Sequence, residues 1–176
     1  MRRLLTRCIS NLCPCFTVEP DAKRDESLSG LIPEPKYDWK NTVPFVPPLG
    51  KGHVIKVYDG DTITIASSLP FPDSPIYRFP VRLNGIDTPE MHGKSEDEKE
   101  AAKNAQQALE RLILHQDVVL KHVQTEKYGR ILAEVYLGDI NLNKWMIDNH
   151  YAVTYDGGTK RAPKSWLKFQ ATGEYD

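Results

Sequence analysis

The body of this sequence contains no cysteine, because all three cysteines lie within the first fifteen residues. This absence excludes a small secreted domain held together by disulfides. No pair of His or Cys residues has the spacing of zinc ligands. The chain also lacks an apolar run long enough for a transmembrane helix, and Arg2 in place of glycine excludes N-myristoylation. With 176 residues, 40% hydrophobic and 27% charged, the composition predicts one compact globular domain with a tail.

An excess of positive charge is also missing. The formal net charge is −1, and the first eighteen residues carry three arginines and no acid, which leaves −4 for the rest. A mildly acidic body does not coat nucleic acid through a broad basic field. Any contact with nucleic acid must therefore be local, through a few phosphates at a cleft. This weakens a pure binding module and is compatible with an enzyme that holds one phosphate.

Residues 1–18 form a basic segment that contains Cys8, Cys13 and Cys15. Its apolar residues recur at helical spacing until Pro14. Three interpretations remain open. The segment is an organelle transit peptide, which predicts a mitochondrial protein, or S-acylation of a cysteine anchors it to an anionic membrane, or it is a tail without function in a cytoplasmic protein.

Residues 19–52 contain six prolines and no sustained hydrophobic period. They predict a linker or an arm that wraps around the domain. Apolar patches at residues 37–39 and 43–46 suggest that the second half of this segment packs on the domain. We expect the folded domain to comprise residues 53–176.

Strands and helices are both predicted in residues 53–176. Five stretches alternate between apolar and polar residues, and they are residues 53–58, 62–66, 77–83, 118–123 and 131–137. Asp59-Gly60-Asp61 predicts a hairpin turn, and Pro80 predicts an edge or bulge position. A capping box at residues 95–98 begins a helix that extends to Ile113. Asn141 caps a second helix and residues 162–169 form a short last one. This pattern favours a small α+β or β-barrel domain.

Two acidic clusters alternate with two arginines along the domain. They are Asp59 and Asp61, then Arg82, then Asp87 and Glu90, and finally Arg130. Clusters of oxygen ligands suit a hard cation such as Ca²⁺ or Mg²⁺, and the guanidinium fork binds phosphate oxygens bidentately. The pattern therefore predicts phosphodiester chemistry.

Four motifs occur in a fixed order between residues 54 and 155. They are Asp59-Gly60-Asp61-Thr62, Val81-Arg82-Leu83 followed by Ile86-Asp87-Thr88-Pro89-Glu90, Lys127-Tyr128-Gly129-Arg130, and Asn141-Leu142 followed by Tyr155. This ordered set resembles the thermonuclease family, the staphylococcal-nuclease-like phosphodiesterases. The resemblance implies an α+β fold: a five-stranded OB-type Greek-key β-barrel with two or three helices.

The resemblance also implies roles for individual residues. Asp61, Asp87 and the Thr88 backbone carbonyl would bind Ca²⁺, with Asp59 just outside the ligands. Arg82 and Arg130 would clamp the scissile phosphate, and Glu90 would orient or deprotonate the attacking water. Lys127, Tyr128 and Tyr155 would contact the substrate.

Each of these roles has a structural alternative. In this alternative, Asp61 and Asp87 are ordinary turn residues, and Arg82 pairs with a carboxylate such as Asp87 at the surface. Glu90 is then a carboxylate at the first turn of a helix, and the two tyrosines are packed at the edge of the core.

The function implied by the resemblance is a calcium-dependent endonuclease with low base specificity that leaves 3′-phosphate ends. We expect single-stranded or unpaired DNA and RNA as substrates, a monomeric protein, and membrane contact through residues 1–18 if a cysteine is acylated. One rival is a catalytically inactive OB-fold scaffold that binds nucleic acid or protein. Another is a metal-dependent phosphodiesterase acting on small nucleotides. Inactive relatives lose the carboxylates or arginines, and this sequence retains them.

Overall fold

The structure is a computed structural model that describes residues 37–126 and 129–175. The chain divides into two compact units, Met1–Thr42 and Val43–Asp176. The described part of the first unit is a turn, in which Asp38 Oδ1 accepts hydrogen bonds from the backbone N–H groups of Lys40 and Asn41 at 2.7 and 3.0 Å. The predictions for residues 1–18 and for Lys127 and Tyr128 concern residues outside the described part of the chain.

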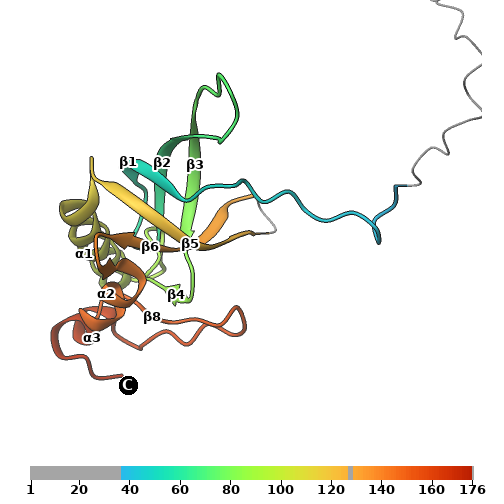
Figure 1. Cartoon of the computed structure of the whole chain (residues 1–176). Coiled ribbons are helices and arrows are strands. Elements are labelled where there is room, and N and C mark those ends of the chain that lie inside the picture. Colours follow the sequence, from blue (N-terminus) through green and yellow to red (C-terminus); the bar gives the residue numbers. More distant parts are fainter. Residues whose placement is uncertain (1–36, 127–128, 176) are drawn as a thin grey trace, which may run out of the picture. The chain divides into compact units, whose positions relative to one another are not determined.

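The second unit contains all the helices and strands of the described chain (Figure 1). The longer strands are β1 (Lys51–Val57), β2 (Thr62–Ser68), β3 (Ile76–Leu83), β5 (Asp117–Thr125) and β6 (Ile131–Leu137). Three short strands are β4 (Ile86–Asp87), β7 (Ile140–Asn141) and β8 (Val153–Thr154). The helices are α1 (Glu96–Ile113), α2 (Leu142–Asp148) and α3 (Trp166–Thr172).

The five longer strands close into a barrel. Antiparallel pairing gives the order β3-β2-β1-β5-β6, and a parallel pairing between β3 and β6, with Val81 opposite Ile131, joins the two ends. Alternate residues point inward, because side chains in a strand alternate between its two faces, and the interior is fully buried at positions such as Val54, Ile63 and Val135. The predicted α+β fold with an OB-type barrel and two or three helices is confirmed.

Two local predictions in the barrel are also confirmed. Asp59-Gly60-Asp61 turns the chain from β1 into β2, and the Tyr58 N–H donates to the Thr62 carbonyl at 2.9 Å. Pro80 is exposed, and the pairing of β3 with β6 begins only at the next residue. Because proline has no N–H to donate, it fits a position where one edge of the strand has no partner.

The N-terminus of α1 forms only half of the predicted capping box. The Glu98 N–H donates to Ser95 Oγ at 3.1 Å, as expected for an N-cap. The Glu98 carboxylate, however, accepts from the N–H groups of Lys94 at 3.2 Å and Glu90 at 3.4 Å. These bonds tie the start of α1 to the loop that carries Glu90.

The last helix begins later than the sequence predicts. We expected it over residues 162–169, and α3 extends from Trp166 to Thr172. Asp97, in the first turn of α1, accepts hydrogen bonds from Ser165 Oγ and from the Trp166 N–H, both at 2.8 Å. A tertiary contact therefore sets the helix start, and local helical spacing could not predict it.

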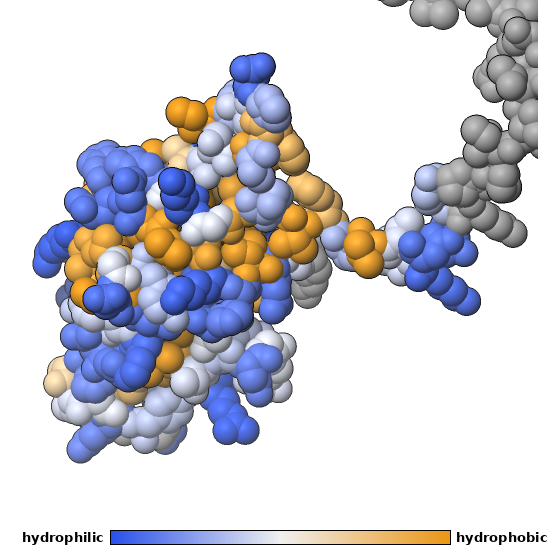
Figure 2. Space-filling model, in the orientation of Figure 1, coloured by the Kyte–Doolittle hydropathy of each residue, from blue (hydrophilic) through white to orange (hydrophobic). Residues whose placement is uncertain are grey.

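The segment before β1 is only partly packed. The side chains of Val43 and Phe45 are exposed, although Thr125 Oγ1 donates to the Phe45 carbonyl at 3.1 Å, and Leu49 is buried. Hydrophobic and hydrophilic residues are interspersed over the face in Figure 2, and the exposed apolar residues of the domain include Ile76 and Val119. Among the described residues, no helix has the length and apolar character needed to cross a bilayer.

The buried side chain of Asn143 connects α2 to the barrel. Its Oδ1 accepts from the Val135 N–H at 2.9 Å, and its Nδ2 donates to the carbonyls of Asn84 at 2.7 Å and Ala133 at 3.2 Å. Asn84 belongs to the turn that follows β3. Asn143 therefore holds in place the chain that continues to Asp87.

We expect Asn143→Ala to lower the free energy of unfolding by about 3 kcal/mol, because it leaves buried backbone groups without partners at about 1–3 kcal/mol each. Urea denaturation of the full chain measures this change. The matched control is Asn149→Ala, which removes an exposed amide that donates to the Trp145 carbonyl and should cost under about 1 kcal/mol. Equal losses in the two variants would contradict the assigned role of Asn143.

Candidate active site

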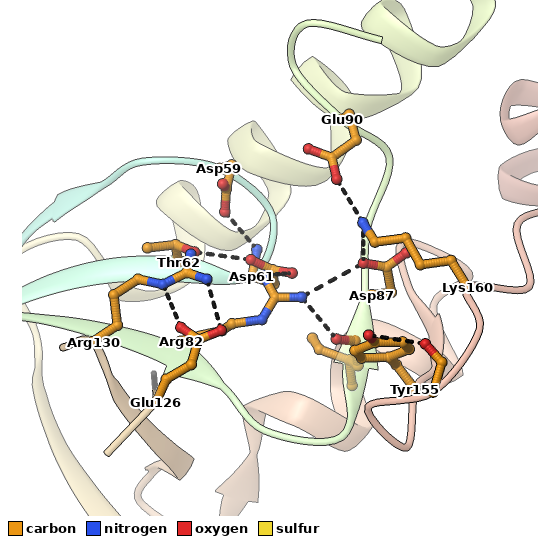
Figure 3. Close-up of polar contacts among 12 residues, drawn as sticks. Asp59, Asp61, Thr62, Arg82, Asp87, Glu90, Glu126, Arg130, Tyr155 and Lys160 are labelled. Carbon is orange, nitrogen blue, oxygen red and sulfur yellow. Dashed lines mark hydrogen bonds and ion pairs between the residues drawn. The ribbon is translucent and has the colours of Figure 1, made fainter. Parts of the chain in front are cut away.

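One cleft of about 340 Å³ gathers most of the side chains that the sequence singles out (Figure 3). The residues that line it come from the β1–β2 turn, β3, the segment after β4, the β5–β6 connection and the chain after β8. They are Asp59, Asp61, Arg82, Thr88, Pro89, Glu90, Glu126, Arg130, Tyr155 and Lys160.

The hairpin turn between β1 and β2 positions Asp61, which is 3% exposed. Asp59 Oδ1 accepts from the Asp61 N–H at 3.0 Å, and Thr62 Oγ1 donates to Asp61 Oδ1 at 2.9 Å. Gly60 allows the turn to pack closely, since a Cβ there would lie 3.0 Å from the side chains of Ala105 and Thr88. The turn is thereby held between α1 and the segment that follows Asp87.

Arg82 extends from β3 toward both acidic clusters. The β2–β3 register places it opposite Thr62, next to Asp61. Its Nη1 lies 2.6 Å from Asp61 Oδ2, and its Nη2 lies 3.5 Å from Asp87 Oδ1. The side chain is 15% exposed, so this is not the surface ion pair of the structural alternative. Arg82 joins the two carboxylates that the sequence places far apart.

A turn and a short strand place Asp87 beside the cleft, in contact with Arg82 and Lys160. Gly85 adopts φ +79°, which favours glycine, and the chain then reverses into β4. Asp87 pairs with Val153 of β8 and is 4% exposed, and the following residue, Thr88, is also buried. Asn84-Gly85 therefore bends the chain toward Asp87.

The two buried carboxylates suit a cation. Burial and the neighbouring charge of Asp59 raise the pKa of Asp61 to about 7, although Arg82 opposes this shift. A hard cation compensates carboxylates that have lost their hydration, and it accepts few protein ligands with water in the remaining positions. No group of three or more His, Cys, Asp or Glu in the described part of the chain could hold a metal. The predicted ligand set, Asp61, Asp87 and the Thr88 carbonyl, has only two carboxylates and so is not such a group of three.

Arg130 is held by a residue that the sequence analysis did not identify. Glu126 accepts from Arg130 Nε at 2.7 Å and from Nη2 at 3.0 Å. The hydrogen bonds to Glu126 raise the pKa of Arg130. Glu126 presents the bidentate geometry that a phosphate would also use. Its position before the Lys127-Tyr128-Gly129-Arg130 motif was the only sequence signal.

Lys160 is the second residue that the sequence analysis missed. Its Nζ lies 2.9 Å from Asp87 Oδ1 and 2.6 Å from Glu90 Oε1. Burial lowers the pKa of Lys160, but the hydrogen bonds to Glu90 and Asp87 outweigh this effect and raise it. No motif marks this lysine, because it enters the cleft through the course of the chain between Tyr155 and α3.

Tyr155 lies at the wall of the cleft. Its N–H donates to the Gly85 carbonyl at 2.9 Å, and its hydroxyl donates to the Gly158 carbonyl at 3.2 Å. The residue also lines a neighbouring pocket of about 410 Å³ with Asp156 and Arg161. The structure thus brings Tyr155 together with Asp61, Arg82 and the other cleft residues.

The fold and the cleft define an OB-barrel protein with two buried carboxylates and two arginines in and beside one cleft. The family model described as "Staphylococcal nuclease homologue" matches residues 80–172, which is more than half of the chain. The chain belongs to this family. The matched range includes Arg82, Asp87, Glu90 and Arg130 and begins after Asp61.

Two curated relatives are each described as "Uncharacterized endonuclease". The relative from Escherichia coli is 29% identical over 106 residues, and the relative from Escherichia coli O157:H7 is 28% identical over 106 residues. Each match covers 60% of this chain and 61% of the relative's length.

Proposed function

We propose that this protein is a calcium-dependent endonuclease that hydrolyses phosphodiester bonds of DNA and RNA. The observation that carries the proposal is the cleft that Asp61, Arg82, Glu90 and Arg130 line together, with Asp87 3.5 Å from Arg82. Family membership and the endonuclease description of the relatives support the reaction class. Asp61, Asp87 and the Thr88 carbonyl would hold Ca²⁺, which when bound supplies positive charge for a phosphate oxygen.

The chain's own residues supply the other functions that this chemistry needs. Negative charge accumulates on the equatorial oxygens of the reacting phosphate, and guanidinium groups already in place stabilise that charge most in the transition state. Arg82 and Arg130 would provide these groups, once Arg130 exchanges Glu126 for phosphate. Glu90 would accept the proton of the attacking water or orient that water in line with the leaving oxygen.

The proposed substrate is single-stranded or unpaired nucleic acid, cut with low base specificity to leave 3′-phosphate ends. The proposed site consists mainly of groups that contact phosphate, which position the substrate and carry no base information. Tyr155 would stack on a base or contact the phosphate, and we propose the same kind of role for Lys127 and Tyr128.

The test is cleavage of single-stranded DNA and RNA by the purified full chain in Ca²⁺, in Mg²⁺ and with a calcium chelator. We expect cleavage in Ca²⁺ with 3′-phosphate products and a loss of about a hundredfold or more with the chelator, because the cation's charge stabilisation is removed. Intact substrate under every condition, with the protein folded by circular dichroism, would reject the enzyme and favour the inactive scaffold.

We propose that residues 53–176 carry this activity in a monomer. The function of residues 1–18 stays a prediction with three alternatives. Membrane association that is lost when Cys8, Cys13 and Cys15 are all replaced by serine would favour S-acylation. Cleavage of the segment on import into mitochondria would favour the transit peptide.

A further inference from the structure

Lys160 occupies the space between two carboxylates of the cleft. It lies on the connection between β8 and α3, and Figure 3 shows its ammonium group pointing toward Asp87 and Glu90. The contact with Asp87 Oδ1 is 2.9 Å, whereas Arg82 Nη2 approaches the same oxygen to only 3.5 Å. Among the ion pairs of the described residues, Lys160 is therefore the cation nearest to Asp87.

We propose that Lys160 is a tethered counter-cation that competes with the divalent cation for Asp87 and so sets the affinity of the cleft for that cation. The inference rests on the cation site of the proposed function. An ammonium group is a compact point charge on a flexible stem, and it donates to the same carboxylate oxygens that a hard cation requires. Contact between Lys160 and Asp87 therefore opposes the binding of a divalent cation to Asp87, and cation binding opposes that contact.

The surroundings of Lys160 allow its side chain to move away from Asp87. Its side chain is 48% exposed, and residues 156–162 around it are exposed. Gly157 in the same connection has φ +90°. Arg82 differs, because its side chain is 15% exposed and contacts Asp61 at 2.6 Å. Of the two cations next to Asp87, Lys160 is the one that can swing into solvent without disturbing the barrel.

The competition has a measurable size. A ligand that needs a conformation populated for only a fraction of the time binds more weakly by that fraction. If Lys160 contacts Asp87 for about nine-tenths of the time, the apparent affinity for the cation falls about tenfold. Removal of the ammonium group should raise the apparent affinity for the cation by the same factor. Replacement of a lysine that does not contact the carboxylates should have little effect on that affinity.

The experiment is a calorimetric titration of the full chain with Ca²⁺ in the absence of nucleic acid. Lys160→Met removes the charge and keeps the length of the side chain. Lys164→Met is the matched control, because Lys164 is exposed on the same connection and its replacement removes an equal charge. Lys160→Arg keeps the competing charge. We expect about tenfold tighter binding in Lys160→Met and values within about twofold of wild type in the other two.

A second measurement follows Lys160 directly. In protein with ¹⁵N-labelled lysine side chains, the Nζ resonance that disappears in Lys160→Met identifies Lys160. We expect this resonance to shift during the Ca²⁺ titration of wild type, whereas that of Lys164 stays in place.

The outcomes separate this inference from the proposed function. Calcium binding of equal affinity in wild type, Lys160→Met and Lys164→Met, with an unchanged Lys160 resonance, would overturn the inference alone. Equal tightening in both methionine variants would also overturn it, because a general loss of charge would explain the result. Absence of calcium binding in every variant would overturn the inference together with the calcium part of the proposed function.

Discussion

Arg82→Ala is expected to reduce kcat for cleavage of single-stranded DNA by about 10³- to 10⁵-fold, the range for an arginine that stabilises a phosphoryl transition state. Its guanidinium lies 2.6 Å from Asp61 and 3.5 Å from Asp87, so it is fixed beside the proposed cation ligands before substrate arrives. A charge that needs no reorganisation stabilises the transition state more than the ground state. The loss should therefore appear in kcat more than in KM.

The control for Arg82→Ala is Arg78→Ala, since Arg78 is an exposed arginine on the same strand, β3. It should change kcat by less than about threefold, as expected for an exposed charge that contributes little. Arg82→Lys keeps the charge and loses the planar fork, so we expect an intermediate loss. Thermal unfolding of each variant checks that the barrel is intact. A kcat for Arg82→Ala similar to that for Arg78→Ala would remove Arg82 from the mechanism.

Glu90→Gln should reduce kcat by about 10²- to 10⁴-fold, because the amide cannot accept the proton of the attacking water. Glu90 is suited to this role by position, since its side chain is 64% exposed at the cleft and its N–H donates to the Glu98 carboxylate. The fold should tolerate this change, because an exposed carboxylate is replaced by an amide of nearly the same shape. Single-turnover kinetics measures the chemical step separately from product release.

The matched control for Glu90→Gln is Glu100→Gln, which makes the same replacement at an exposed position of α1. We expect its rate to equal that of wild type within about twofold, because an exposed helix carboxylate contributes little. If Glu90→Gln retains wild-type single-turnover rates, Glu90 neither accepts the proton nor positions the water.

Local patterns predicted the regular elements well because they depend on local physics. Alternation marks a strand with one buried face, and a polar cap followed by helical spacing marks a helix start. The five barrel strands and α1 follow these rules. The short strands β4, β7 and β8 do not, because two residues carry no period and form strands only by pairing with a partner.

The sequence also indicated most of the cleft through the order of its motifs. Asp61, Arg82 and Asp87 are marked because each lies at a turn or strand end with a residue type suited to cations or phosphate. The partners of these groups are not marked in the same way. Glu126 and Lys160 are a glutamate and a lysine among many, and contact with Arg130 and Asp87 distinguishes them.

The sequence by itself determined the class of fold, the acidic and basic groups of the candidate site and the family resemblance, because these depend on residue type and spacing along the chain. Tertiary structure alone decided which charges neutralise one another. Barrel closure through β3 and β6 and the pairing of β4 with β8 bring Arg82, Asp87 and Lys160 within ion-pair distance. Electrostatic energy depends on the distance between charges in space and on their burial, and neither quantity can be read from the order of residues along the chain.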